Sequence, residues 1–156
     1  MKRSGFAEAE CPVARALDAI GDVWSLLIVR DAFDGLRRFG DFQKNLGIAK
    51  GMLSARLRRL VELGVLEPVP ASDGSAYQEY LLTPKGRGVF PILVALRQWS
   101  EEFGDTSAIA TLLVDRNTGR PVRKLELRAD DGRLLGNGDT ELKPNAGAKR
   151  RRRIPA

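Results

Sequence analysis

A concentration of basic side chains between residues 35 and 61 is the part of this sequence best suited to bind another molecule. Seven lysine and arginine residues occur there against a single acid, Asp41. The basic residues are Arg37, Arg38, Lys44, Lys50, Arg56, Arg58 and Arg59. Nucleic-acid phosphates would neutralise such a patch. The alternative is a solvated basic helix face, but such faces usually mix both signs in pairs that support the helix.

The apolar residues of the same stretch predict two short helices joined by a tight turn. Leu53, Leu57, Leu60 and Val61 recur at helical spacing and must face a core. The preceding helix, residues 39–46, ends before Gly47, which supplies a sharp, left-handed link. The other face of the second helix carries small and basic side chains, a composition that suits the DNA major groove. We therefore predict a DNA-reading helix–turn–helix.

This prediction assigns a role to each exposed residue of the motif. The residues expected to read base edges are Lys50, Gly51, Ser54, Ala55 and Arg58. Those expected to contact the phosphate backbone are Arg37, Arg38, Lys44, Arg56 and Arg59.

Composition excludes most enzyme chemistries. The chain has 156 residues, with 43% apolar and 29% charged, enough for one domain core and a small appendage. It contains no histidine and one cysteine, which rules out histidine-based triads, histidine or cysteine-rich metal sites and an intrachain disulfide. No enzyme activity, cofactor or metal is expected. No apolar run is long enough to span a bilayer, so we expect a cytoplasmic protein without membrane contact.

Helices and a hairpin flank the motif. Pro12 opens a first helix that ends at Gly21, and Asp22 caps a second that ends at Gly35. After the motif, residues 65–69 and 77–82 are strand-like and predict a hairpin, or wing. Thr83 and Pro84 then start a long helix that extends to about Phe103, with a kink at Pro91.

The long helix has an apolar stripe that a small domain cannot cover by itself, so we expect it to form a homodimer with the first helix as its companion. The residues assigned to dimerisation are Val13, Leu17, Val89, Ile92, Leu93, Leu96, Trp99 and Phe103.

The remaining segments complete the predicted organisation. Residues 1–10 form a flexible arm, 11–105 the DNA-binding and dimerisation domain, 106–142 a small β-rich appendage with strands at 109–114 and 122–128, and 143–156 a disordered basic tail. The tail adds either nonspecific DNA affinity or only solubility. The fold class is α+β, mainly α: a winged helix–turn–helix with a long C-terminal dimerisation helix and a small β appendage.

Residues 11–103 resemble the HxlR-type regulators, winged-helix relatives of the MarR group. The resemblance is carried by Cys11-Pro12, Gly21-x-x-Trp24, Leu27-Ile28, Arg30-Asp31, Gly35-x-Arg37-Arg38-Phe39, Gly47-Ile48, Met52-Leu53, Arg56-Leu57, Leu60, Gly64-Val65-Leu66, Glu79-Tyr80, Leu82-Thr83-Pro84-Lys85-Gly86 and Trp99. It implies a dimeric bacterial transcription regulator on a palindromic operator, with the second helix of the motif in the major groove and the wing near the minor groove. A winged-helix module for RNA or a protein partner is the alternative.

The sequence departs from the family pattern in three places: at Ala49, at Val23 or its neighbour, where a lysine is usual, and at the wing tip. Cys11 leaves two interpretations open. Ala49 stands where a serine is usual, so the second helix loses a side-chain cap worth about 1 kcal/mol. The wing tip, residues 71–76, has no basic residue and one acid. Cys11, at a helix start, is either a sensor of oxidants or electrophiles, as in some members of the resembled family, or a structural residue whose thiolate is opposed by Glu8 and Glu10. A small-molecule or oxidant effector is a further candidate partner, and the sequence does not identify it.

Overall fold

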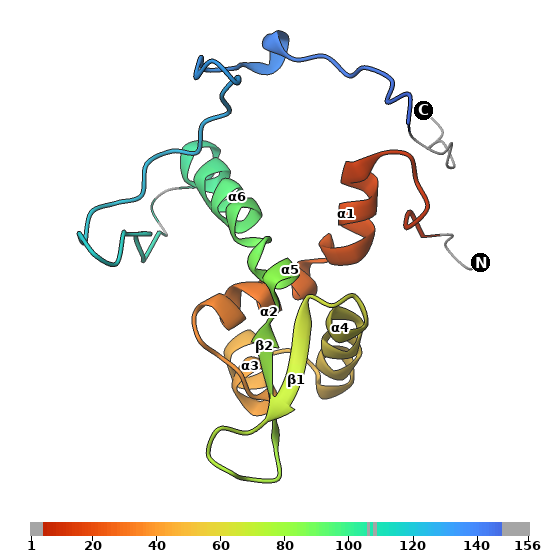
Figure 1. Ribbon diagram of the computed structural model, residues 1–156. Coiled ribbons are helices and arrows are strands. Elements are labelled where there is room, and N and C mark those ends of the chain that lie inside the picture. The colour runs from red at the N-terminus through yellow and green to blue at the C-terminus, as the bar shows by residue number, and fades with distance from the viewer. Residues whose placement is uncertain (1–4, 106, 108, 148–156) are drawn as a thin grey trace. The chain divides into compact units, whose positions relative to one another are not determined.

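Four helices precede the sheet, as the periodicity predicts. The computed structural model describes residues 5–105, 107 and 109–147. The helices are α1 (Pro12–Ile20), α2 (Val23–Phe33), α3 (Phe39–Leu46) and α4 (Lys50–Glu62) (Figure 1). Pro12 lies in the first turn of α1, where no backbone donor is required. The carboxylate of Asp22 accepts a hydrogen bond of 3.0 Å from the backbone N–H of Ser25 and so caps α2.

The wing is a two-stranded antiparallel hairpin. β1 (Leu66–Pro70) pairs with β2 (Gln78–Leu82), with Leu66 opposite Leu82. The backbone before α3 is bonded to this hairpin: the backbone N–H of Tyr80 donates to the carbonyl of Arg37 at 2.8 Å. The hairpin is therefore anchored to the start of the helix–turn–helix.

The core lies between α2, α3, α4 and the hairpin. Its fully buried apolar residues are Ile28, Val29, Phe42, Leu53, Leu57, Leu60, Val65 and Leu66. Val61, expected in the same stripe, is half-buried at its edge. Truncating any buried leucine of this set to alanine would cost about 2–5 kcal/mol. The apolar stripe of α4 thus fixes which face of that helix is left for another molecule.

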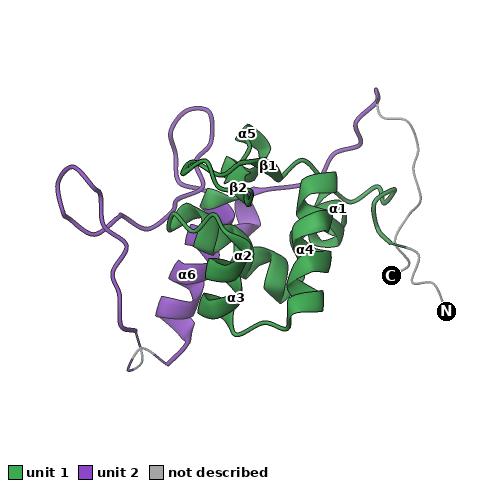
Figure 2. Cartoon of the chain, turned by 90° about the horizontal axis from the view of Figure 1, so that it is seen from below, with its two compact units in different colours: residues 1–90, 149–156 green, residues 91–148 purple. Residues whose placement is uncertain are grey.

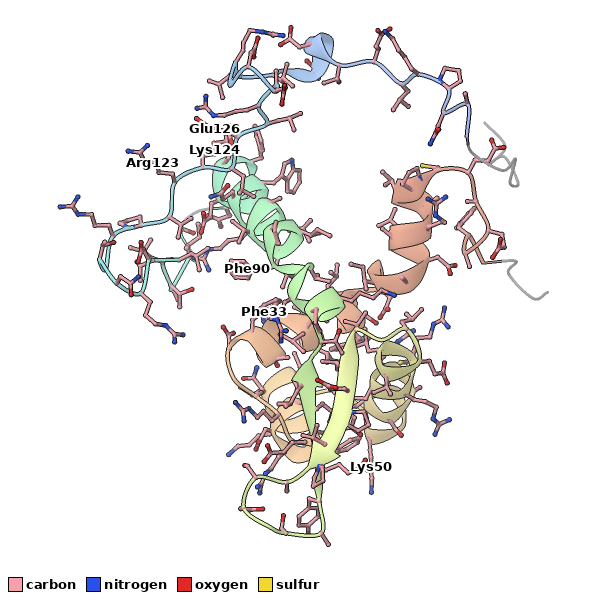
Figure 3. The ribbon with its side chains drawn as sticks, in the orientation of Figure 1. Phe33, Lys50, Phe90, Arg123, Lys124 and Glu126 are labelled. Carbon is pink, nitrogen blue, oxygen red and sulfur yellow. The ribbon has the colours of Figure 1, made fainter. Side chains whose placement is uncertain are left out.

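A close backbone approach requires glycine at position 86. The Thr83 hydroxyl donates to the carbonyl of Gly64 at 2.6 Å and accepts from the N–H of Gly86, which caps α5 (Pro84–Arg87). A Cβ at Gly86 would lie 2.1 Å from the carbonyl oxygen of Val65, so any side chain would force the two segments apart. Phe33 of α2 packs beside Phe90, with ring centroids 5.1 Å apart (Figure 3).

The prediction of one long helix from residue 83 to 103 is wrong. α5 ends at Arg87, and α6 (Phe90–Phe103) begins afresh after Gly88 and Val89. Pro91 has no N–H and tolerates only the first turn of a helix, so it starts α6 instead of kinking a longer one. Val89 is only 6% exposed and lies in the break. Its assignment to the exposed dimerisation stripe is therefore wrong.

The chain divides into two compact units (Figure 2), and the boundary along the chain falls between Phe90 and Pro91. Among the described residues the first unit contains 5–90 and the second contains 91–147. Almost all of α6 thus belongs with the segment that follows it. No helix in the described part of the chain has the length and apolar character needed to cross a membrane.

The segment after α6 contains the predicted turns but not the predicted strands. Gly119 and Gly132 close tight turns with positive φ, whereas pairing is limited to isolated bridges, Val114 with Pro121 and Arg128 with Leu134. A 3-10 turn, η2 (Asn137–Asp139), follows. Most described apolar side chains here are exposed, and Leu113 and Leu135 are half-buried, so the described residues form no second layer that would extend the pairs into a sheet. The expected β-rich appendage is therefore an irregular segment with two hairpin-like turns.

This irregular segment is held to α6 by polar contacts within the second unit. The side-chain amide of Gln98 donates to the carbonyl of Arg123 at 3.0 Å, and its oxygen accepts from the N–H of Leu125 at 2.8 Å. Lys124 forms an ion pair with Glu102 of α6 (Figure 3). The segment therefore has a defined attachment to α6.

The described part of the N-terminal arm is attached to α1. The N–H of Phe6 donates to the carboxylate of Asp18 at 2.8 Å, and Arg15 donates to the carbonyl of Ala9 at 2.6 Å. Side chains of α1 therefore contact the backbone of this part of the arm at Phe6, Ala9 and Glu10. Residues 1–4 and the basic run 149–153 of the expected disordered tail lie outside the described residues.

Candidate nucleic-acid interface

The turn of the helix–turn–helix has the geometry that its sequence predicts. Gly47 adopts a left-handed conformation with φ 60°, and its N–H donates to the carbonyl of Gln43 at 3.0 Å. Ile48 is buried in the corner between the helices. Ala49 precedes α4 in extended conformation without a side-chain cap, so the first backbone N–H groups of α4 have no side-chain acceptor there. α3 and α4 pack on each other and on α2.

α4 separates a buried face from an exposed one. Leu53, Leu57 and Leu60 are in the core. Of the five residues expected to read bases, Lys50, Gly51, Ala55 and Arg58 are exposed, and Ser54 is half-buried. Lys50 lies at the end of α4 nearest the wing loop (Figure 3). The structure thus brings these residues together on one helix face beside the hairpin.

Two arginines of α4 are paired within the protein instead of facing outward alone. Arg56 Nε lies 3.3 Å from the carboxylate of Asp22, which also caps α2. Arg59 lies 3.9 Å from both Asp18 of α1 and Glu62 of its own helix. The sequence predicts phosphate contacts for both. Their acidic partners favour a role in holding α4 on α1 and α2.

The cations near α3 also differ in their surroundings. Arg38 contacts Asp73 at 2.6 Å and Glu79 at 3.3 Å, whereas Arg37 reaches only Glu79, at 3.9 Å. Lys44 is exposed at the end of α3. Within the described ranges no ion pair involves Lys44, Lys50 or Arg58. Of the seven basic residues between positions 35 and 61, these three are therefore without an acidic partner among the described residues.

Two buried carboxylates position the motif, and the sequence analysis assigned a role to neither. Asp31 of α2 accepts hydrogen bonds from Arg30 and from Asn45 of α3. Glu79 of β2 accepts from the hydroxyl of Ser72 at 2.9 Å and from Arg38. The sequence contained a sign that Glu79 is buried. Side chains alternate along a strand, so Glu79 lies on the same face of β2 as the apolar Leu81, and Gln78 lies on the other face. An acid at an inward strand position requires partners.

The residues assigned to dimerisation are mostly exposed in the single chain. Trp99 and Phe103 of α6 are 65% and 68% exposed, with ring centroids 6.0 Å apart. Ile92 and Leu96 are also exposed, and Leu93 is half-buried. On α1, in the other unit, Val13 and Leu17 are exposed as well. Each helix therefore carries apolar side chains that its own unit leaves uncovered.

Cys11 is exposed and stands immediately before α1. Its carbonyl accepts from the N–H of Arg15 at 3.2 Å, so its position at the helix start matches the sequence-based expectation. In the part of the chain that the structure describes, no group of three or more histidine, cysteine or carboxylate residues could hold a metal ion.

A glycine-linked helix pair followed by an antiparallel hairpin defines a winged helix–turn–helix. The HxlR-like helix-turn-helix family profile matches residues 19–108, and the chain belongs to that family. An uncharacterised HTH-type transcriptional regulator of Mycobacterium tuberculosis strain H37Rv, Rv3095, is 50% identical over 91 residues, which are 58% of each chain. YdeP of Bacillus subtilis, of the same description, is 33% identical over 61% of this chain and 75% of its own. The match therefore spans little more than half the length of the first curated relatives. The relatives are described as transcriptional regulators, and this chain shares their helix–turn–helix fold.

Solved structures extend the similarity beyond the motif. The crystal structure of PA1607, a candidate transcription factor, has a TM-score of 0.85 at 56% identity over 90% of this chain and 99% of that one. PA1374 from Pseudomonas aeruginosa has a TM-score of 0.63 at 38% identity over 89% of this chain and 95% of its own. The oxidised redox regulator HypR, by contrast, covers only 61% of this chain, and 99% of its own, with a TM-score of 0.55 at 32% identity. The first two comparisons therefore include most of the second unit.

Proposed function

We propose that the chain binds a specific double-stranded DNA operator through the exposed face of α4. The observation that carries this proposal is the face itself, where Lys50, Gly51, Ser54, Ala55 and Arg58 stand opposite the buried leucines. Glycine and alanine allow close approach to base edges, and arginine can donate two hydrogen bonds to guanine. The uncapped start of α4 adds N–H groups suited to a phosphate.

Phosphate contacts position this face on the duplex. The cations best placed for that role are Lys44, at the end of α3, and Arg37, whose guanidinium has one distant partner. Lys50 contributes to both functions because it begins α4. Backbone contacts of this kind fix register without carrying sequence information. The ion pairs of Arg56 and Arg59 connect α4 to Asp22, the cap of α2, and to Asp18 of α1.

The regulator acts as a homodimer on a two-fold symmetric operator. Support for this comes from the exposed apolar residues of α6 and α1, because uncovered apolar surface on a regulator of this size usually marks a partner surface. A second copy closes the assembly with two-fold symmetry. The two α4 helices then enter successive major grooves about 34 Å apart.

Selection from a random DNA pool tests this function. The full chain should enrich duplexes that contain an inverted repeat with half-sites about one helical turn apart. A random-sequence duplex of the same length serves as the reference, and binding to both is measured against salt concentration. Failure to enrich any sequence would contradict operator recognition. Preferential enrichment of RNA from a matched pool would instead favour an RNA-binding winged-helix module.

A redox response is a second candidate function. It is favoured by the exposed Cys11 at a helix start and by the likeness to HypR, which is described as a redox regulator. Thiols at helix N-termini ionise and react more readily. Treatment with diamide should change operator binding by the wild-type protein and leave Cys11→Ser unchanged. Equal behaviour of the two proteins would assign Cys11 to structure alone.

A further inference from the structure

Arg38 joins the start of α3 to two parts of the wing that lie far from it in sequence, the wing loop and β2. It is the residue immediately before α3, and its guanidinium lies 2.6 Å from the carboxylate of Asp73 in the wing loop. The same guanidinium donates through Nε and a terminal nitrogen to Glu79 of β2, at 3.4 and 3.3 Å. One side chain therefore ties the start of the motif to both the loop and the second strand of the wing.

Glu79 is the fixed centre of this arrangement. Its side chain is 5% exposed, and it also accepts hydrogen bonds from the hydroxyl and the backbone N–H of Ser72, at 2.9 and 3.3 Å. A buried carboxylate of this kind requires such partners. The Ser72 hydrogen bond holds the pKa of Glu79 below its ordinary value, and the hydrogen bond from Arg38 does the same for Asp73. Both carboxylates are therefore ionised at neutral pH.

The acid at the wing tip is unexpected in a DNA-binding hairpin, where basic residues are the favourable choice. The ion pair with Arg38 explains why Asp73 occurs in the wing loop. The pair neutralises the Arg38 charge and closes the loop back toward α3, so Arg38 is poorly placed to neutralise a phosphate. A planar guanidinium suits this task because it can satisfy two carboxylates at once, which an ammonium on a flexible stem does poorly.

We propose that Arg38, Asp73 and Glu79 form a clamp that sets the position of the wing relative to α3 and α4, and that Arg38 is a positioning residue instead of a phosphate contact. The clamp deepens the proposed function and rests on it for its effect on DNA. It holds the wing in the free protein, so binding costs less ordering of the hairpin. The clamp determines how the wing meets the duplex without contributing a charge.

The first test needs no DNA. Hydrogen exchange of the wing amides is followed in the free wild-type protein and in Arg38→Ala, Arg38→Lys and Asp73→Asn. All three variants should exchange faster at residues 71–79, while the amides of α4 keep their protection. Arg37→Ala is the matched control, because that side chain reaches Glu79 only at 3.9 Å and does not contact Asp73. Unchanged exchange in Arg38→Ala and Asp73→Asn would overturn the clamp.

The second test uses the duplex selected from the random pool and a random duplex of equal length. Arg38→Ala should weaken binding to the selected duplex roughly threefold or more, Arg38→Lys should not restore it, and the double variant with Asp73→Asn should lose little more than either single variant. The salt dependence should stay unchanged, whereas Arg37→Ala should flatten it by about one phosphate contact. A flattened salt dependence in Arg38→Ala together with full binding by Arg38→Lys would make Arg38 a phosphate contact. Tighter binding by Asp73→Asn would make Asp73 an inhibitory decoy for phosphate. Either result would overturn the proposal.

These two tests separate the clamp from the proposed function. If the wild-type chain selects no duplex, operator recognition fails, yet hydrogen exchange in the free protein still decides whether the clamp exists. Asp73→Asn guards against misfolding, because its side chain is half exposed and its replacement does not strand the buried Glu79. Faster wing exchange in Asp73→Asn with an unchanged melting temperature is the result that supports the clamp most directly.

Discussion

The carboxylate of Asp31 in α2 accepts a hydrogen bond of 2.8 Å from the side-chain amide of Asn45 in α3. Asp31 is 1% exposed, and its other oxygen is held by the guanidinium of its neighbour Arg30. The backbone carbonyl of Asp31 also accepts from the N–H of Leu36 at 3.0 Å. One buried residue thus secures both the loop that leads into the helix–turn–helix and the last turn of its first helix.

Replacing Asn45 should therefore destabilise the protein. We expect Asn45→Ala to lower the free energy of unfolding by about 1–3 kcal/mol, because one oxygen of a buried carboxylate is left without its donor. Gln43→Ala, on the same helix, is the control and should stay within about 0.5 kcal/mol of the wild type. Urea denaturation provides the measurement. Equal stability of the two variants would show that water replaces the amide at no cost.

Arg58 is expected to read a base. Its side chain is exposed on α4 and has no acidic partner among the described residues, unlike Arg56 and Arg59. Arg58→Ala should lose about 1–3 kcal/mol of binding free energy on the selected duplex and relax the preference at one base pair. Fluorescence anisotropy with a panel of single-base variants measures both effects. An equal loss on the random duplex would reassign Arg58 to the phosphate backbone.

Alanine substitutions at two glycines in matching helix positions can distinguish an effect on DNA binding from an effect on protein stability. Gly51 is the second residue of α4 and Gly40 the second of α3, and a Cβ at either position would meet no atom within 4 Å. Alanine should therefore stabilise each helix by up to about 0.5–1 kcal/mol. Only Gly51→Ala should also weaken operator binding, because its methyl group would occupy the space beside a base edge. Thermal denaturation and anisotropy on both variants test this, and a binding loss in Gly40→Ala would contradict the assignment of faces.

The wing clamp predicts a dependence on acid. The hydrogen bond from Arg38 lowers the pKa of Asp73 below its ordinary value of 3.8. Because the folded-state pKa is the lower one, the ionised carboxylate stabilises the folded wing above pH 3.8, and this stabilisation disappears as the pH falls through the folded value. The wild type should therefore be more stable than Asp73→Asn at about pH 7, and this advantage should shrink progressively as the pH falls below the ordinary value of 3.8. Urea denaturation of both proteins at each pH measures the difference. A constant difference would exclude Asp73 as its source.

Local sequence patterns were enough to predict the elements of the DNA-binding unit. Helix caps at Asp22 and Thr83, the left-handed Gly47 and the leucine spacing of α4 act over a few residues, so their consequences are visible in the sequence. The break before Pro91 also had a local signal, since proline is tolerated only in a first turn. The error there was to extend a strong apolar stripe through Gly88 and Val89.

Contacts between distant segments could not be predicted. Arg38 was assigned to phosphate because a basic residue beside a recognition helix usually has that role, and nothing in the sequence pairs it with an acid 41 positions away. The strands expected after residue 106 failed for a related reason. Residues 122–128 alternate well enough for a strand, but a strand also needs a layer to cover it, and apolar residues such as Leu125 and Leu127 are instead exposed.

The last prediction concerns the dimer. Leu96 lies on α6 between Ile92 and Trp99 at helical spacing, and all three are exposed in the single chain. If a second copy covers this face, Leu96→Asp places an unpaired charge in the interface and should abolish dimerisation. Because Leu96 is 48% exposed within its own chain, the variant should remain folded as a monomer. Sedimentation velocity and circular dichroism measure these two properties.

Operator binding should depend on the dimer more strongly than on any single contact. Once one α4 helix is bound, the second binds at high effective concentration, so the monomeric variant should lose about a hundredfold or more in affinity for an inverted repeat. Its affinity for an isolated half-site should change little. Val23→Asp is the matched control, since Val23 is an exposed apolar residue in the first turn of α2, where an acid suits the helix dipole. A wild-type protein that sediments as a monomer at micromolar concentration, or a Leu96→Asp protein that still dimerises, would mean that the apolar face of α6 serves another partner.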